Sequence, residues 1–223
     1  MSNASDADRL PKEIVRDGWN HASTKYRLED ASADAFGHTV DEHAGWLRPL
    51  MTKFPPGARV LDLGCGMGVP DVELLSGRFQ VLGVDISDEQ IRRARIRVPN
   101  AEFLRADMTE LQLAEGRFSG IVCLYALIHV PLLEQRPLLG RIYRWLAPDG
   151  LVLITTGHQA FTGTEENWLG SGATMYWSHA DAATYRAWFH DLGFEIQRQE
   201  TIPEGTSSHE LFLLKKGNRL GRD

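Results

Sequence analysis

Residues 59–75 read RVLDLGCGMGVPDVELL, and this stretch decides the fold. A short apolar run ends in three glycines, each separated from the next by one residue, and a helix-like pattern follows. An apolar run of this kind is typical of a strand buried on both faces of a parallel sheet. Glycines at its end allow the backbone to approach a ligand closely, and the amino end of the following helix favours an anionic group.

The alternation of strand and helix continues along the chain. Further apolar strands are predicted at 79–85, 101–107, 119–127 and 151–157, with helices between them. Two helices, roughly 12–27 and 40–54, precede the first strand; a long polar and aromatic loop from residue 157, a helix near 179–194 and a hairpin of 195–202 with 209–216 follow the fifth. Ser87 and Gln90 form a capping-box pattern at the start of one helix. The pattern predicts an α/β fold with a mostly parallel sheet covered on both faces.

Composition narrows the class of protein. The chain has 223 residues, 43% of them hydrophobic, and a net charge of −6, which fits one domain and no nucleic-acid partner. The densest basic cluster, RRARIR at 92–97, fits the solvated face of a helix. The two cysteines, Cys65 and Cys123, give neither a metal-ligand spacing nor a disulfide framework, so reduced thiols in the cytoplasm are expected, with no metal. No apolar stretch approaches the length of a membrane span.

Acidic residues stand at the ends of successive strands, where ligands bind in such sheets. Asp85 follows Gly64 by 21 residues and is suited to accept both hydroxyls of a ribose, and Asp107 is suited to accept from the exocyclic amine of adenine. Asp62 precedes the first glycine inside an apolar strand, where a buried carboxylate is costly unless it is paired. A pyrophosphate would repel Asp62, whereas a ligand with an ammonium and a sulfonium would not. The residues therefore favour S-adenosylmethionine over a dinucleotide.

Five segments carry a family resemblance. VLDLGCGMG at 60–68 resembles the first motif of class I S-adenosylmethionine-dependent methyltransferases, and VLGVDIS, FLRADMTEL, FSGIVCLYALIHVP and LAPDGLVLITT are similar to the later motifs in the same order. The match runs roughly from Ala58 to Thr156. It implies a three-layer Rossmann-like methyltransferase fold with a seven-stranded, mostly parallel sheet, one antiparallel strand and an N-terminal helical lid.

The resemblance also implies roles for individual residues. Gly64 and Gly66 pass the amino acid moiety of the cofactor, Asp62 lies near its ammonium, and Asp85 holds the ribose. The expected cofactor-binding set is Tyr26, Asp62, Gly64, Cys65, Gly66, Gly68, Asp85, Ile86, Gln90, Asp107, Met108, Leu124 and Tyr125. Within it, Ile86, Asp107 and Met108 contact the adenine, Leu124 and Tyr125 line the floor near the methionine part, and Tyr26 approaches the methionine end from the lid.

The acceptor is expected to contact segments outside the common core. His129 follows the fourth strand and is the candidate general base; a structural hydrogen bond is the alternative for it. The candidate substrate-binding residues are Trp19 and His21 in the first helix and His158, Glu165, Trp168 and Tyr176 in the long loop. A connection this long and aromatic is usually functional, although simple packing would also explain several of its aromatic residues. His209, at the start of the last strand, is interpreted as structural.

The leading hypothesis is methyl transfer from S-adenosylmethionine, leaving S-adenosylhomocysteine, to oxygen or nitrogen of a small molecule, such as a natural product. Methylation of protein or RNA is the alternative, and binding of the cofactor without methyl transfer is a hypothesis of a different class. A nicotinamide-dependent oxidoreductase is the fourth. A monomer or homodimer without a membrane partner is expected. The single domain 1–223 is divided into a lid at 1–56, a cofactor-binding core at 57–156, a substrate loop at 157–180, and a last helix with hairpin at 181–216.

Overall fold

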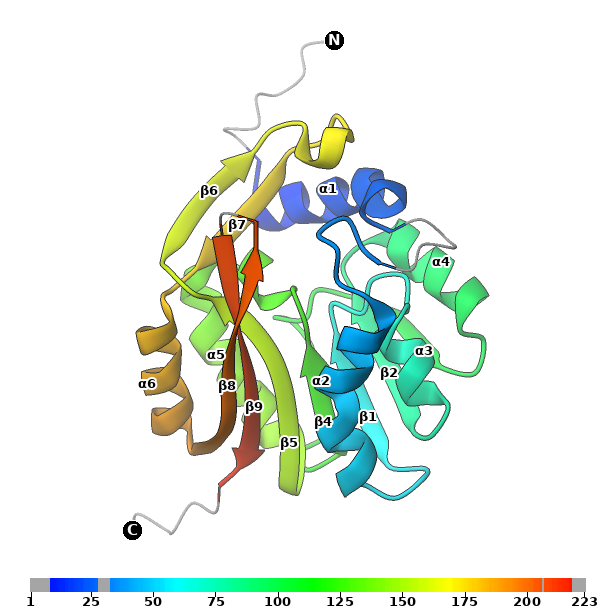
Figure 1. The fold of residues 1–223 in the computed structure, drawn as a ribbon, viewed down its shortest axis with the longest axis vertical. Coiled ribbons are helices and arrows are strands. Elements are labelled where there is room, and N and C mark those ends of the chain that lie inside the picture. The colour runs from blue at the N-terminus through cyan, green and yellow to red at the C-terminus, as the bar shows by residue number, and fades with distance from the viewer. Residues whose placement is uncertain (1–8, 28–32, 206, 218–223) are drawn as a thin grey trace.

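A seven-stranded sheet forms the centre of the protein, in the order β3-β2-β1-β4-β5-β9-β8 (Figure 1). The computed structural model describes residues 9–27, 33–205 and 207–217. The strands are β1 Arg59–Leu63, β2 Gln80–Asp85, β3 Glu102–Arg105, β4 Phe118–Cys123, β5 Leu146–Gly157, β8 Phe194–Glu204 and β9 Ser207–Lys216. β9 runs antiparallel to both β5 and β8, and the pairs among β1 to β5 are parallel. The predicted seven-stranded sheet with one antiparallel strand is confirmed.

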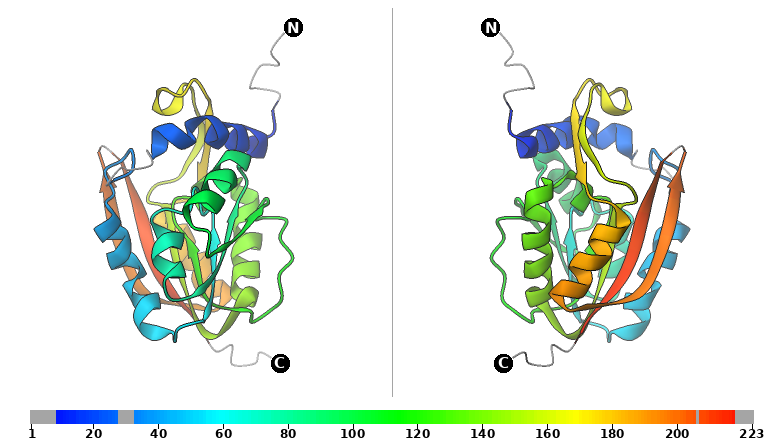
Figure 2. Two further views of the ribbon diagram at one scale, coloured as in Figure 1. Left: turned by 90° about the vertical axis from the view of Figure 1, so that its right-hand side faces the viewer. Right: turned by 90° about the vertical axis from the view of Figure 1, so that its left-hand side faces the viewer.

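Helices cover both faces of this sheet, which gives the three predicted layers (Figure 2). They are α1 Pro11–Tyr26, α2 Val40–Lys53, α3 Asp71–Ser76, α4 Asp88–Arg97, α5 Leu132–Trp145 and α6 Ala182–Leu192. One core cluster joins the sheet to α5 and α6, and a second joins its other face to α2, α3 and α4. α1 belongs to neither layer and lies across the carboxyl ends of the strands (Figures 1 and 2). None of the described helices has the length and apolarity that crossing a bilayer requires.

The connection at 157–180 differs from the expected loop. β6 (Phe161–Glu165) and β7 (Met175–His179) pair antiparallel as a separate two-stranded sheet. A 3₁₀ turn, η3 (Trp168–Gly170), forms the tip, where Asn167 and Leu169 both adopt left-handed conformations. The prediction of a loop was wrong because glycines and acidic residues interrupt the alternation that marks a strand, while threonine and aromatic residues still favour pairing. The hairpin places its tip beside α1 (Figure 1).

Two further differences concern boundaries. β5 starts at Leu146, five residues before the predicted start at 151, and it pairs with β4 through an irregular register. The capping box at Ser87 is half formed. The Ser87 hydroxyl accepts from the backbone N–H of Gln90, but the Gln90 side chain accepts from Ser23 of α1 instead of closing back on Ser87. That exchange links α4 to the helix that covers the sheet edge.

Candidate functional site

A cavity lies where the carboxyl ends of β1, β2 and β4 meet α1, and we call it the switch-point cavity. The winding of the sheet reverses between β1 and β4, which is where open α/β sheets bind ligands. Its volume is about 100 Å³, and side chains of α1 form part of its wall. The lining residues are Val15, Trp19, Ser23, Tyr26, Arg27, His43, Gly64, Cys65, Gly66, Met67, Val69, Pro70, Asp71, Asp85, Ile86, Gln90, Met108, Leu124, Tyr125, Ala126 and His129.

The glycine loop brings backbone to this cavity. Gly64 has a φ of 79°, and a Cβ placed on it would overlap the Cβ of Ala126 well inside van der Waals contact. Gly66 also has a positive φ, and its N–H donates to the carboxylate of Asp85 across 2.9 Å. Gly64 is therefore required for both conformation and space. Gly68 packs against Val98 on the far side of the loop and does not line the cavity.

Two buried carboxyl groups lie at the ends of β1 and β2. Burial raises the pKa of Asp85 to about 6, against hydrogen bonds from the N–H groups of Ser87 and Gly66. Burial also raises the pKa of Asp62, and the nearby charges of Asp71 and Asp85 act in the same direction. Asp62 is 3% exposed and, although predicted to bind the cofactor, does not line the cavity. This end of the cavity therefore favours a ligand that brings positive charge.

α1 forms the roof of the cavity. Trp19 and Tyr26 line it from above, with their rings edge to face at 5.0 Å. Asn20 accepts from the Ser87 hydroxyl and from the N–H of Glu89, at the amino end of α4. His21, predicted in the substrate site, instead lies on the exposed side of α1, where its Nδ1 is 2.7 Å from the carbonyl oxygen of Asp17.

The far wall separates residues that were predicted together. Ile86 and Met108 line the cavity, but Asp107 does not. Asp107 forms an ion pair of 2.8 Å with Lys12 of α1 and accepts from the N–H of Thr109. Although burial acts to raise it, these contacts lower the pKa of Asp107.

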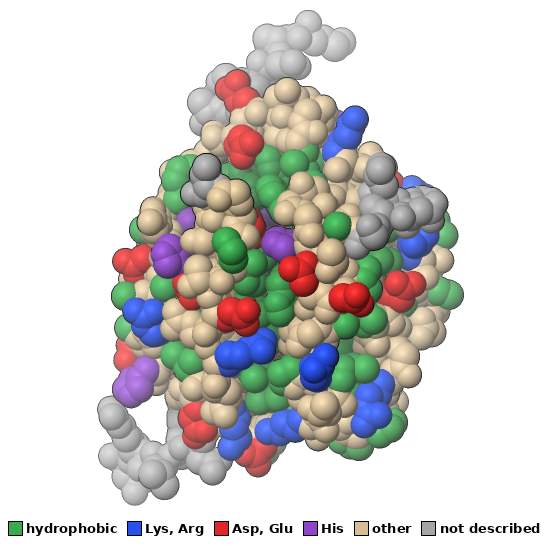
Figure 3. Space-filling view, in the orientation of Figure 1, with side chains coloured by type: hydrophobic (Ala, Val, Ile, Leu, Met, Phe, Trp, Pro, Cys, Tyr) green, Lys and Arg blue, Asp and Glu red, His purple; other side chains and the backbone are tan. Residues whose placement is uncertain are grey.

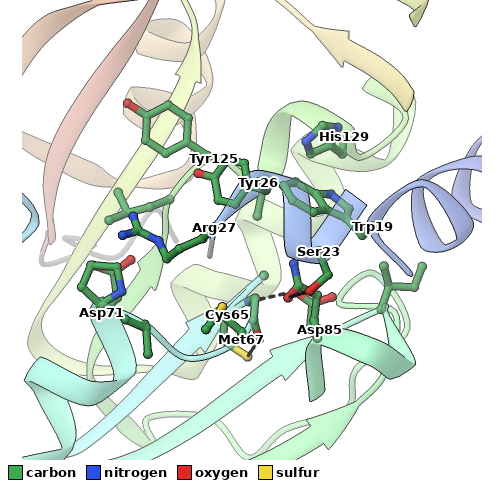
Figure 4. A pocket seen from close by; sticks show the side chains of 18 of the residues that line it. Trp19, Ser23, Tyr26, Arg27, Cys65, Met67, Asp71, Asp85, Tyr125 and His129 are labelled. Atoms are coloured by element: carbon green, nitrogen blue, oxygen red, sulfur yellow. Dashed lines mark hydrogen bonds between the residues drawn. The ribbon is translucent and has the colours of Figure 1, made fainter. Parts of the chain in front are cut away.

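Sequence reasoning missed two basic residues at the opposite end from Ser23 and Asp85. Arg27 lines the cavity beside Tyr26 and Tyr125 (Figure 4). Its Nη1 is buried without a hydrogen-bond partner, and so is Nε2 of His43, whose Nδ1 lies 2.7 Å from Asp71. Arg27 directly follows α1, outside every motif, so no spacing in the sequence marks it. Nη1 of Arg27 can only donate and therefore favours an anionic ligand group, whereas Nε2 of His43 is placed to accept a hydrogen bond because Nδ1 faces the Asp71 carboxylate.

His129 lines the same cavity from the 3₁₀ turn η2 (Leu127–His129). Its Nδ1 is 2.8 Å from the backbone carbonyl oxygen of Tyr176, which favours the tautomer that donates there and leaves Nε2 unprotonated. Burial lowers the pKa of His129 to about 4, and this hydrogen bond only partly opposes it. Trp19 and Trp177 pack against the ring. His129 is therefore a neutral hydrogen-bond acceptor at physiological pH.

A larger cavity of about 660 Å³ lies between the hairpins β6–β7 and β8–β9, and we call it the hairpin cavity. Its lining residues are Phe36, His158, Gln159, Ala160, Phe161, Thr164, Glu165, Trp168, Leu169, Trp177, His179, Glu204, Ser207, Ser208 and His209. Histidine and hydrophobic side chains gather on this face of the molecule near the ends of the hairpins (Figure 3). Three of the predicted substrate residues, His158, Glu165 and Trp168, line it, whereas Tyr176 lines neither cavity.

An aromatic layer lies between the two cavities. Trp168 is 2% exposed and packs edge to face on Trp19, 4.9 Å away, and on Trp177, 5.9 Å away. Trp19 and Tyr26 line the switch-point cavity, while Trp168 and Trp177 line the hairpin cavity. Only this layer of aromatic side chains therefore separates the two cavities at this point.

Comparison with known proteins finds methyltransferases among the sequence relatives. Residues 60–150 match the family model of a methyltransferase domain. The chain is 31% identical over 166 residues to phosphoethanolamine N-methyltransferase 1 of Triticum aestivum, covering 72% of this chain and 32% of that protein. It is 31% identical over 114 residues to the uncharacterized methyltransferase sll0829 of Synechocystis, covering 51% of each. The chain thus spans about a third to a half of these relatives.

Among solved structures, a similar one is magnesium protoporphyrin IX methyltransferase from Synechocystis with bound S-adenosylhomocysteine. The TM-score is 0.70 at 21% identity, covering 93% of this chain and 100% of that chain. At this identity the likeness supports the fold, and it extends over the helical lid as well as the core.

Proposed function

The chain belongs to the class I S-adenosylmethionine-dependent methyltransferase family, and from that premise we propose that it methylates oxygen or nitrogen of a small molecule held in the hairpin cavity. The observation that carries the proposal is the hairpin cavity itself. Its volume of about 660 Å³ is in the range of small-molecule sites, roughly 300–1,000 Å³. It meets the switch-point cavity across one layer of aromatic side chains.

The residues of the switch-point cavity fit S-adenosylmethionine, which supplies an electrophilic methyl group. Arg27 keeps a buried Nη1 without a partner, which suits the carboxylate of the methionine moiety. Asp62 is a buried carboxyl group beneath the glycine loop, which suits the ammonium. Asp85 keeps lone pairs for the ribose hydroxyls while it holds the glycine loop. These three roles are part of the proposal.

The protein's contribution to methyl transfer is mainly alignment, because displacement at a sulfonium has a neutral leaving group. We assign His129 the role of orienting the acceptor molecule, by accepting a hydrogen bond from it through Nε2. Trp19 and Trp177 fix the imidazole plane, and the carbonyl oxygen of Tyr176 fixes its tautomer. Aromatic walls also exclude water from the reacting atoms.

The expected partners follow from the same features. The hairpin cavity is a concave site, not an open groove or a basic stripe, which favours a small molecule over protein or nucleic acid. Cys65 and Cys123 are free and buried, which supports a reducing, cytoplasmic location. We keep the division into lid, core, substrate segment and terminal hairpin as a proposal, together with a monomer or homodimer.

The test is transfer of label from methyl-labelled S-adenosylmethionine into a fractionated cell extract. Label in the small-molecule fraction is expected, and its mass identifies the acceptor. Label only in protein or RNA would replace this proposal with the macromolecular one. If S-adenosylhomocysteine binds but no fraction of several extracts gains label, the protein binds the cofactor without transferring a methyl group.

A further inference from the structure

A histidine and a glutamate face each other inside the hairpin cavity. His209 of β9 and Glu204 of β8 come from the two sides of the terminal hairpin, and both line the cavity. Nδ1 of His209 lies 3.0 Å from Oε1 of Glu204. The side chains are 10% and 7% exposed, and neither of these two atoms forms a hydrogen bond as placed. Two buried polar atoms at this distance are most stable when a proton lies between them and forms a hydrogen bond.

The other nitrogen of His209 is differently placed. Nε2 forms no hydrogen bond with any described residue, and it is not among the buried atoms that lack a partner. It is therefore reached from the cavity. An imidazole with one nitrogen toward a carboxylate and the other toward a ligand site has the arrangement of a general base.

The position of His209 relates it to the methyl donor. Its ring packs edge to face on Tyr125 at 5.5 Å, and Tyr125 lines the switch-point cavity. His209 is thus one aromatic ring away from the cofactor-binding residues. The backbone of Tyr125 adopts a φ of 52°, which is unfavourable for a tyrosine and is often found at functional sites.

The other titratable groups around the pair are His38, Tyr125 and His179. Nε2 of His38 lies 3.7 Å from Oε1 of Glu204, and the ring of His179 lies 6.2 Å from that of His209. Although burial opposes it, Asp34 raises the pKa of His38, with Glu204 adding to the effect. Burial and the charge of Glu204 raise the pKa of Tyr125, so its hydroxyl stays protonated. Glu204 is the only carboxylate among the described groups within 4 Å of His209.

We propose that His209 takes the proton that the acceptor loses on methylation, and that Glu204 is the positioning residue that holds the resulting imidazolium. This inference rests on the proposed function. The nucleophile's lone pair forms the new bond to the methyl carbon, and the electrons of the broken carbon–sulfur bond remain on sulfur. The proton of the O–H or N–H group passes to Nε2 of His209, and its bonding electrons stay on oxygen or nitrogen.

The assignment narrows the acceptor. The nucleophile of the acceptor must be a hydroxyl group or an amine that carries a hydrogen, because a carboxylate or a tertiary amine has no proton to give. No described lysine or arginine lines the hairpin cavity, while Glu165 and Glu204 do. A neutral or cationic molecule with an aromatic or aliphatic body therefore fits between Phe161, Trp168 and Trp177, and a phosphate ester does not.

The test uses the full chain, labelled S-adenosylmethionine and the small-molecule fraction of a cell extract, assayed at serial dilutions to separate kcat from apparent KM. His209→Gln keeps a hydrogen-bonding side chain but cannot act as a base, and we expect kcat to fall by about 100-fold or more. His209→Ala should fall similarly and regain activity with added imidazole. Glu204→Gln should lose about 10-fold or more. His190→Ala, on the exposed side of α6, is the control and should match the wild type.

Binding of S-adenosylhomocysteine is measured for each variant by calorimetry, and it should stay within about 2-fold because His209 does not line the switch-point cavity. A His209→Gln variant that binds S-adenosylhomocysteine and turns over near the wild-type rate overturns the base assignment. Loss of activity in His209→Ala without rescue by imidazole, together with a raised apparent KM only, shows a binding role and also overturns it. Failure of the wild type to label any small molecule overturns the proposed function, and this inference with it.

Discussion

The clearest test of the cofactor loop is a steric one, at Gly64. Gly64 and Gly57 share a φ of 79°, but a Cβ at Gly57 meets nothing within 4 Å, whereas one at Gly64 overlaps Ala126. Gly57→Ala therefore reports only the left-handed backbone cost, about 1–2 kcal/mol. Gly64→Ala should add the cost of overpacking, about 1–3 kcal/mol. The difference between the two variants isolates the overlap.

Denaturant unfolding measures the backbone cost and the overpacking cost. It is applied to the two single variants and to each of them combined with Ala126→Gly. Removing the methyl of Ala126 should recover about 1–3 kcal/mol in the Gly64→Ala background and nothing in the Gly57→Ala background. S-adenosylhomocysteine affinity should fall in Gly64→Ala and stay unchanged in Gly57→Ala, since Gly57 is remote from the switch-point cavity. The reasoning is refuted if Gly64→Ala is no less stable than Gly57→Ala, or if Ala126→Gly brings no recovery.

Three further predictions follow from the site. Arg27→Met should weaken the binding of S-adenosylhomocysteine by roughly 10- to 100-fold, the value of a charged hydrogen bond. Binding of 5′-methylthioadenosine should be unaffected, because that ligand lacks the carboxylate. Equal losses of affinity for both ligands, measured by calorimetry, would exclude the carboxylate role. His129→Ala should lower kcat by about 100-fold, a larger factor than its effect on S-adenosylhomocysteine affinity, and near-normal turnover would remove His129 from the mechanism. Because burial raises the pKa of Asp85 to about 6, the native state binds this proton more tightly than the unfolded chain, and its contribution to stability is lost as pH rises from about 4 through 6. The free energy of unfolding of Asp85→Asn minus that of the wild type should therefore rise by about 2 kcal/mol between pH 4 and pH 7, and a pH-independent difference would contradict the raised pKa.

The core of the fold was predictable because its signals are local. Buried parallel strands are continuous apolar runs. The residues at their carboxyl ends, such as Gly64 and Asp85, are restricted in type by the ligand site at this edge of the sheet. The direction of the closing hairpin followed from the family resemblance. Both features depend on short stretches of chain, and the structure confirms both.

The parts that were missed depend on distant contacts. Arg27 reaches the switch-point cavity only because α1 lies across the sheet edge, and no motif marks its position. The contact between His209 and Glu204 could not be predicted, because the sequence does not reveal that β8 brings Glu204 to within 3.0 Å of His209. The β6–β7 pairing depends on antiparallel backbone hydrogen bonds between two segments, neither of which shows a regular strand pattern in its own sequence.

The attachment of α1 to α4 has a kinetic consequence. The side chain of Asn20 completes the cap of α4, while Ser23 is bonded to Gln90 and Arg93. In the proposed binding mode, the nucleoside end of the cofactor lies behind α1, and release of α1 also removes the cap of α4. We expect dissociation of spent cofactor to be slower than the chemical step, so that a rapid first turnover precedes a slower steady state. Asn20→Ala should shorten the residence time of S-adenosylhomocysteine and diminish that burst. The side-chain amide of Asn20 would then limit the steady-state rate through product release.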